Sequence, residues 1–282
     1  MSDTLQLPQP TWFVGCGNMG GAILDGWRLG GIDLSAVTVI RPSGMPVEGT
    51  RTVMSLDGAG AAPKLVVLAF KPQKLDEVAP ELRQHLSAKT VLVSLLAGVE
   101  AASLRERFPG AAAIVRVMPN LPVSVRRGVT ALFSPDADER TQVELNNLFS
   151  ALGFAMWMAD ESRLAALGSV AGAGPAYVAR FIAALSKAGA KRGLTPEIAA
   201  VIARETVLGT AWMAATRNED MESIAKRVAS PKGTTEAGLA ILDHEGVLDE
   251  LMSVTIEAAA RRGAELAEEA RTALLAESAR SA

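Results

Sequence analysis

The residues most informative for chemistry lie near the start of the chain, where Gly15 to Gly20 read GCGNMG. An apolar run, Trp12–Val14, precedes them, and a helix-forming stretch, Ala22–Leu29, follows them. Glycines at this spacing let a strand turn tightly into a helix while the backbone approaches a pyrophosphate, whose charge meets the free N–H groups and positive dipole end of the helix. The pattern therefore predicts a dinucleotide site. We expect its contacts from Val14, Gly15, Cys16, Gly17, Asn18, Met19 and Gly20.

The end of the second predicted strand, 37–40, indicates which dinucleotide fits. An NAD site usually presents Asp or Glu there, which bonds the ribose 2′-hydroxyl. Here Arg41, Pro42 and Ser43 follow the strand, and a guanidinium and a hydroxyl suit a 2′-phosphate. One charge-assisted contact is worth about 1.5–3 kcal/mol, or about a ten- to hundredfold preference. We therefore expect NADPH, bound through Arg41 and Ser43, with NADH bound more weakly; the alternative is that Arg41 is a solvated loop charge.

Three further segments follow predicted strands, at the edge of an open α/β sheet where ligands gather. LAFKPQ, at 68–73, places a lysine where it could face phosphates or ribose. SLLAGV, at 94–99, contains small residues against which a nicotinamide could lie, and RVMPNLP, at 116–122, places an amide after a strand. The cofactor contacts expected from these segments are Ala69, Phe70, Lys71, Pro72, Ala97, Gly98 and Asn120.

A fourth segment, SPKGTT at 230–235, is typical of a turn that enters a helix. Several N–H groups of such a turn have no helical partner, so they can receive a carboxylate without any arginine. The alternative is a simple N-cap, in which Ser230 or Thr234 bonds the free backbone donors.

The elements that position these segments form an α/β pattern from residue 9 to about 160, with short apolar runs alternating with helix-like segments. The predicted strands are 11–14, 37–40, 65–70, 91–95, 113–117, 129–133 and 154–158, and the predicted helices are 21–29, 73–85, 101–108 and 138–152. Several strands are continuously apolar, which predicts a parallel sheet with helices on both faces. We expect a Rossmann-type dinucleotide-binding domain at residues 1–160.

Residues 161–282 read as helix alone, with two long helices predicted at 176–192 and 196–216. A domain of this size with so much apolar surface and few aromatic residues is expected to bury part of that surface against a partner chain. We therefore predict an all-helical dimerisation domain and a homodimer or higher homo-oligomer. The alternative is a self-contained helical bundle.

Composition limits the other classes of function. The 282 residues suffice for two domains, and 28 basic against 31 acidic residues leave a net charge of -3, which gives no reason to expect nucleic acid or a membrane as a partner. Because the chain has one cysteine, a disulfide framework is excluded, and because it has only two histidines besides, we expect no metal site built from histidine and cysteine. The polar N-terminal segment lacks a signal-peptide pattern and no uncharged apolar stretch of 18 residues occurs, so we expect a cytoplasmic enzyme.

Taken together, six motifs resemble one family, the pyrroline-5-carboxylate reductases. They are GCGNMG, LAFKPQ, LAGV, RVMPNLP, AGAGPAYV at 171–178 and ASPKGTTEAGL at 229–239, in the order and spacing of that family over nearly the whole chain. The resemblance implies NADPH-dependent reduction of (S)-1-pyrroline-5-carboxylate to L-proline, the final step of proline biosynthesis. It also implies an N-terminal Rossmann domain and a helical C-terminal domain through which subunits dimerise and sometimes assemble further.

The resemblance also implies roles for single residues. Thr235 places its hydroxyl beside the ring nitrogen and is the catalytic residue, and Glu161 is a weaker candidate near the substrate. The other substrate contacts are Ser230, Gly233 and Thr234. Hydride from the nicotinamide attacks the imine carbon, and because a cyclic imine is itself basic enough to be protonated in water, no strong protein acid is needed.

The chain departs from the family pattern at several of these positions. Ala171 and Ala173 stand where serines are more frequent, Ala165 to Gly168 stand where Asp-Ala-Val-Thr is frequent, and Lys232 stands where glycine is usual. Each loss of a hydroxyl or carboxylate bears on activity and substrate identity more than on fold. The alternatives are a reductase of another cyclic imine, an NADP-dependent β-hydroxyacid dehydrogenase whose base would be Lys187 or Lys191, and a non-catalytic NADPH-binding paralogue.

Overall fold

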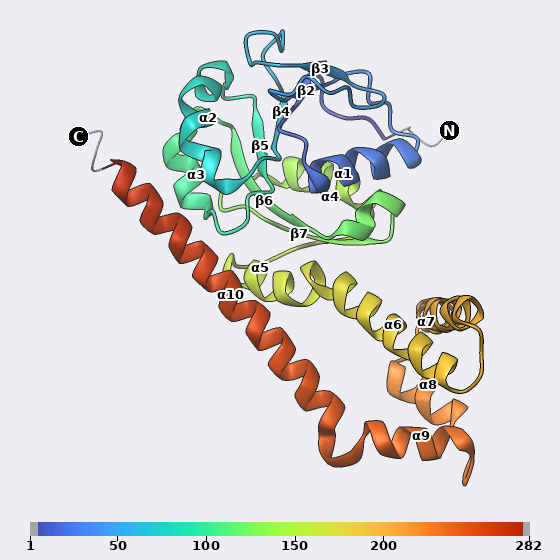
Figure 1. Cartoon of the computed structure of the whole chain (residues 1–282). Helices are drawn as coiled ribbons and strands as arrows, with labels where there is room; N and C mark the ends of the chain where they lie inside the picture. Colours follow the sequence, from blue (N-terminus) through green and yellow to red (C-terminus); the bar gives the residue numbers. More distant parts are fainter. Residues whose placement is uncertain (1–4, 279–282) are drawn as a thin grey trace. The chain divides into compact units, whose positions relative to one another are not determined.

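A computed structural model describes residues 5–278 of the chain (Figure 1). It divides into two compact units: the first comprises the residues up to Ala173 together with those from Ala259 onward, and the second comprises Gly174–Ala258. The first unit thus continues past residue 160, where the sequence predicts the domain boundary. That predicted boundary remains a prediction.

The first unit is built on an eight-stranded sheet with the strand order β3-β2-β1-β4-β5-β6-β7-β8. The strands are β1 (Thr11–Val14), β2 (Val37–Ile40), β3 (Arg51–Val53), β4 (Leu65–Leu68), β5 (Val91–Ser94), β6 (Ala113–Pro119), β7 (Gly128–Phe133) and β8 (Gly153–Trp157). All seven predicted strands are present. The sequence does not predict β3, because three partly exposed residues at the sheet edge are too short to show a periodic pattern.

The parallel arrangement is confirmed for β1 to β6 but not beyond them. β6 and β7 are antiparallel, with Arg116 opposite Phe133, while β8 runs parallel to β7. The connection from β6 to β7 holds only a short 3-10 helix, η3 (Leu121–Val125), and a left-handed residue, Arg126 (φ 58°). A parallel pair needs a crossover of a dozen residues or more, so this short connection forces the chain to reverse.

The helices of the first unit cover both faces of the sheet (Figure 1). Besides η3 and the part of α10 (Val247–Ser278) that begins at Ala259, the helices of this unit are α1 (Asn18–Leu29), η1 (Pro72–Lys74), α2 (Leu75–Leu82), η2 (Arg83–His85), α3 (Ala101–Arg107), α4 (Glu139–Ser150), α5 (Ser162–Leu167) and the π-helical η4 (Gly168–Gly172). On one face Phe13 packs in a core with α1 and α4, and on the other its neighbour Trp12 packs in a core with α2 and α3. The Trp12 indole and the Phe13 phenyl ring are both fully buried, which explains the continuously apolar strands.

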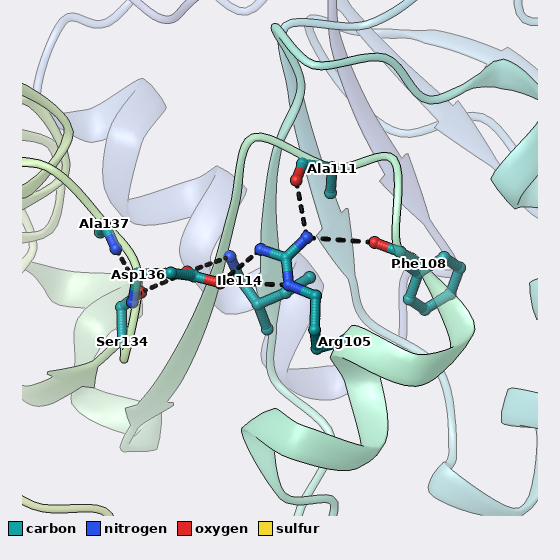
Figure 2. A network of polar contacts seen from close by, with 7 residues as sticks. All are labelled: Arg105, Phe108, Ala111, Ile114, Ser134, Asp136 and Ala137. Carbon is teal, nitrogen blue, oxygen red and sulfur yellow. Dashed lines mark hydrogen bonds and ion pairs between the residues drawn. The ribbon is translucent and has the colours of Figure 1, made fainter.

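A polar network holds α3 to the strands beside it (Figure 2). Arg105 donates through Nη1 to the carbonyl oxygens of Phe108 (3.3 Å) and Ala111 (2.7 Å), and its guanidinium pairs with Asp136. Asp136 in turn accepts the amide of Ile114 at 2.9 Å. The network therefore fixes the connection from α3 to β6 and the loop that follows β7.

The second unit is helical. Its helices are α6 (Gly174–Lys191), α7 (Pro196–Arg217), α8 (Met221–Val228), α9 (Thr234–Leu242), η5 (His244–Gly246) and the first part of α10 (Val247–Ser278). α6 and α7 pack along each other. The buried side chains that the structure describes in this unit are few and mostly small: Ala199, Ala203, Ala214 and Ile224. Large apolar side chains such as Phe181, Leu208 and Trp212 are exposed in the single chain.

Candidate active site

The glycine turn after β1 lies against the end of β4. Gly15 has φ 80°, and a Cβ there would lie 2.8 Å from the Ala69 carbonyl oxygen and 2.9 Å from the Phe70 Cβ. A Cβ on Gly20 would lie 3.0 Å from the Ala69 Cβ. These close approaches explain two of the motif glycines, and they bring the predicted contacts at 14–20 and at 69–70 together at one edge of the sheet.

The start of α1 is arranged for an anion. The helical hydrogen-bond ladder begins with Gly21 N donating to Gly17 O at 2.9 Å, so the amides of Asn18, Met19 and Gly20 lie ahead of it. The N-cap residue is Gly17, which has no side chain that could cap these donors, and the first turn holds no acidic residue. Free amides and a positive dipole end are what a pyrophosphate requires.

Arg41 brings positive charge to the same turn. Gly15 N donates to Ile40 O at 2.8 Å, which joins the glycine turn to the end of β2, and Arg41 follows directly. Burial raises the pKa of the half-buried Cys16 thiol, and the positive charge of Arg41 works in the opposite direction on the same pKa. The guanidinium is therefore close enough to the glycine turn to act on it electrostatically. Ser43 is exposed two residues further along.

The ends of β4 and β5 complete this edge of the sheet. Ala69 N donates to Val14 O at 2.8 Å, and after it Lys71 is exposed. Beyond β5, Ala97 is exposed and Gly98 adopts φ 76°, a conformation that favours glycine. Because β1, β4 and β5 are parallel, their carboxyl ends meet at one edge, which is where open α/β sheets bind ligands.

Asn120 follows β6 but its amide is already engaged. The side chain is buried, donates through Nδ2 to Ala171 O at 3.0 Å, and accepts the Val129 amide through Oδ1 at 2.8 Å. These bonds join the end of β6 to the π-helical segment η4. The role of Asn120 in cofactor binding remains a prediction.

Glu161 also has partners within the first unit. Its Oε1 accepts Arg116 Nη1 and the amide of Ala101, both at 2.7 Å. The sequence does not predict a role for Arg116; the only signal is a charged residue inside the apolar strand AIVRVM. The predicted contact of Glu161 with substrate remains a prediction.

The predicted substrate turn precedes α9 in the second unit. Gly233 is the N-cap, and a Cβ there would lie 2.4 Å from Ser230 Oγ, so the turn is closed tightly around a glycine. The ladder of α9 begins with Ala237 N donating to Gly233 O at 3.2 Å, which places the amides of Thr234 and Thr235 ahead of it. The N-cap residue, Gly233, makes no side-chain capping bond, so the described structure does not support a simple N-cap formed by Ser230 or Thr234.

Lys232 and Glu236 contact each other in this turn. Lys232 has φ 59°, which explains why glycine suits the position. Its amide donates to Glu236 Oε2 at 2.6 Å. The sequence analysis does not predict this contact, although its local signal is present: a glutamate three residues after the N-cap, as in a capping box. The turn thus already holds one carboxylate of its own chain.

One other group of potential ligands stands apart from these sites. Carboxylate oxygens of Asp57 and Glu81 and a ring nitrogen of His85 lie within 4.8 Å of one another, and the His85 ring packs against Trp12 with centroids 5.5 Å apart. The absence of a metal site remains a prediction.

Two family models and several curated relatives are similar to this chain. A family model described as "Pyrroline-5-carboxylate reductase dimerisation" matches residues 161–266, and one described as "NADP oxidoreductase coenzyme F420-dependent" matches residues 12–98. A pyrroline-5-carboxylate reductase of Pseudomonas aeruginosa is 33% identical over 264 residues, which cover 91% of this chain and 96% of that protein. One from Synechocystis is 38% identical over 204 residues, covering 72% and 75% of the two chains.

Two solved structures are similar to this chain over most of its length. A pyrroline-5-carboxylate reductase of Coxiella burnetii superposes with a TM-score of 0.83 at 31% identity, covering 92% of this chain and 99% of that one. The Plasmodium falciparum pyrroline carboxylate reductase with NADP bound gives a TM-score of 0.79 at 25% identity, covering 91% and 97%.

A Rossmann sheet with an anion-binding glycine turn, followed by a helical domain, defines the class: a dinucleotide-dependent oxidoreductase. The likeness to the relatives extends over nearly the whole chain. The chain belongs to the pyrroline-5-carboxylate reductase family. The helical domain is that of a homo-oligomer.

Proposed function

We propose that the protein reduces (S)-1-pyrroline-5-carboxylate to L-proline with NADPH, the final step of proline biosynthesis. The observation that carries the proposal is that this chain, which is similar to reductases of that name over 91% of its length, keeps two helix starts suited to anions. The start of α1 fits the phosphates of a dinucleotide, and the turn before α9 fits the carboxylate of a small ring acid.

NADPH is the cofactor we assign, with NADH bound more weakly. The pyrophosphate is received by the amides after the glycine turn, and Arg41 and Ser43 face the 2′-phosphate. The relative from Plasmodium falciparum is described with NADP bound, which supports this choice. When bound, the cofactor supplies a hydride to the imine carbon.

The residues of this chain contribute binding and orientation. Ser230, Gly233 and Thr234 hold the substrate carboxylate at the tight turn, and the half-buried Thr235 aims its hydroxyl at the ring nitrogen. Because a cyclic imine is basic enough to be protonated in water, before or during hydride transfer, orientation is the main demand on the enzyme. This explains why the turn contains no histidine.

We further propose a homodimer, or a higher homo-oligomer built from it, in the cytoplasm, with no nucleic acid or membrane as a partner. By length and composition α7 is the one helix in the described part of the chain that could cross a membrane, with a mean hydropathy of 1.3 and 17% of its apolar window buried. Arg204 and Glu205 lie in the middle of α7, where a bilayer disfavours charge. A second copy of the chain is the better cover for this surface.

The alternatives make different demands. A β-hydroxyacid dehydrogenase needs a base to take the hydroxyl proton; Lys187 and Lys191 of α6 are both exposed and distant in sequence from GPAY. A reductase of another cyclic imine needs the same turn, and a non-catalytic paralogue needs only the cofactor site. A fall in NADPH absorbance with pyrroline-5-carboxylate or with a six-membered cyclic imino acid reports imine reduction. A rise in absorbance when NADP+ is mixed with β-hydroxyacids reports hydroxyacid oxidation, so the two measurements separate the alternatives. Rapid oxidation of NADPH with pyrroline-5-carboxylate, and not with the other candidate substrates, supports the proposal. Cofactor binding without turnover contradicts it.

A further inference from the structure

The carboxylate of Glu161 performs two tasks that the proposed reaction does not assign to it. It caps α3 from 60 residues further along the chain, through the 2.7 Å bond from the Ala101 amide to Oε1. The same oxygen pairs with Arg116 of β6 at 2.7 Å. One atom therefore joins a helix start, a central strand and the beginning of α5.

The cap is needed because α3 has no local one. Its N-cap residue is Glu100, whose side chain makes no capping hydrogen bond. α3 spans only seven residues, so its first turn depends on partners outside the helix. Glu161 supplies that partner, and the turn that it fixes, residues 96–100, contains Ala97 and Gly98.

Arg116 explains why the carboxylate stays in place. The arginine lies between Ser94 of β5 and Phe133 of β7 in the sheet register, and its side chain is only 10% exposed. An unpaired guanidinium at such a position is strongly unfavourable, so the pair holds Glu161 on the sheet. A second bond, from Asn120 Nδ2 to the Ala171 carbonyl oxygen, holds the π-helical segment η4, which follows Glu161 and α5, to the end of β6.

We propose that Glu161 is a positioning residue for the nicotinamide end of the cofactor rather than a substrate contact. It fixes the turn 96–100 by capping α3, and through that turn it sets the surface that Ala97 and Gly98 offer to the nicotinamide. The inference rests on the proposed NADPH site, but it concerns only one half of the cofactor.

The test compares two probes on the purified full-length chain: NADPH, and adenosine 2′,5′-bisphosphate, which lacks the nicotinamide. Glu161→Ala should weaken NADPH binding by up to about tenfold, because an internal charged hydrogen bond that positions the nicotinamide site is lost, and should leave the bisphosphate within about twofold of wild type. Glu161→Gln keeps an acceptor for the Ala101 amide, so its affinity for NADPH should lie between those of Glu161→Ala and wild type. Asp160→Asn is the matched control, because Asp160 is an exposed neighbouring carboxylate that bonds the Arg163 amide (3.2 Å) and guanidinium (2.9 Å) and should change neither probe.

Three results would overturn the inference. They are equal losses for both probes, unchanged binding of both probes and of substrate, and unchanged binding of both probes with a raised KM for pyrroline-5-carboxylate. The last of these would make Glu161 a substrate contact. Because neither probe requires turnover, failure of the wild-type chain to reduce pyrroline-5-carboxylate would count against the proposed function and not against this assignment.

Discussion

Arg41 is the residue on which the choice between the two nicotinamide cofactors depends. It follows β2, and its charge acts on the thiol in the glycine turn. Arg41→Ala should raise the KM for NADPH about ten- to hundredfold, because a charged contact with the 2′-phosphate is lost, and should leave the KM for NADH nearly unchanged. Steady-state kinetics with both cofactors measure this. Equal effects on the two would remove Arg41 from the phosphate site.

Thr235 is expected to act on the ring nitrogen and not on the cofactor. Thr235→Ala should lower kcat about tenfold or more, as for loss of a positioned hydrogen bond, while the Kd for NADPH stays the same. Thr235→Ser retains the hydroxyl and should recover most of the rate. If the serine and alanine variants lose activity equally, the methyl group and its packing matter, and the hydroxyl does not.

Cys16, the single cysteine of the chain, reports on the glycine turn. Burial raises its pKa, so the thiolate is scarce near neutral pH and alkylation by N-ethylmaleimide should accelerate only toward alkaline pH, with a midpoint above that of an ordinary thiol. Arg41 lowers this pKa, so Arg41→Ala should move the midpoint further up. Mass spectrometry of the alkylated chain measures the rate, and saturating NADPH should suppress it. An unprotected thiol would place the cofactor elsewhere.

At the level of helices and strands, α1 shows how closely the elements of the first unit pack. A Cβ on Gly26 would lie 2.2 Å from the Val123 carbonyl oxygen, so α1 approaches η3 at a distance that only glycine permits. Alanine in a helix interior normally stabilises by about 1 kcal/mol relative to glycine. At Gly26 the sign should reverse, and Gly26→Ala should destabilise by about 1–3 kcal/mol through overpacking.

Gly21 of the same helix is the control, since a Cβ there meets nothing within 4 Å. Gly21→Ala should stabilise the cofactor-free protein by about 0.5–1 kcal/mol. Urea unfolding of the two variants beside wild type compares the free energies. A stabilising Gly26→Ala would show that α1 and η3 are further apart than the structure places them.

The elements differ in how far the sequence predicts them, for a physical reason. β1 and β2 are predicted with the bounds that the structure gives, because continuous apolar runs between turn residues are local signals. The sequence does not predict β3, because that strand is only three residues long. It does not predict the antiparallel direction of β7 either, because that direction depends on the length of the loop after β6. The roles of Arg116 and Glu161 depend on two residues 45 positions apart, and no local pattern encodes such a contact.

The same limit applies to the turn before α9. Its glycine and its free amides follow from the local sequence, and the structure places Ser230, Gly233, Thr234 and Thr235 in one turn as the motif predicts. Whether these residues hold substrate is a property of a bound complex, which neither local pattern nor backbone geometry determines.

For the protein as an assembly, the second unit is the decisive part. Its exposed apolar side chains occur on several helices, from Phe181 on α6 to Trp212 on α7 and Ile241 on α9. Burying a fully exposed side chain of this size contributes about 1.5–3 kcal/mol, and covering the exposed half or more of one contributes a corresponding share. A single chain forgoes that contribution at many positions, so its helical unit should be stable only when a second copy covers it.

Disrupting this surface should separate the subunits. Val201 and Leu208 lie seven residues apart on α7, hence on one helical face, and are 49% and 58% exposed in the single chain. The double variant Val201→Glu, Leu208→Glu should sediment as a monomer and unfold at lower temperature, because buried unpaired carboxylates disfavour association. Val143→Glu is the matched control, since Val143 is 55% exposed on α4 of the first unit, and it should leave the assembly unchanged. A doubly substituted chain that still sediments as wild type would place the subunit interface on another face.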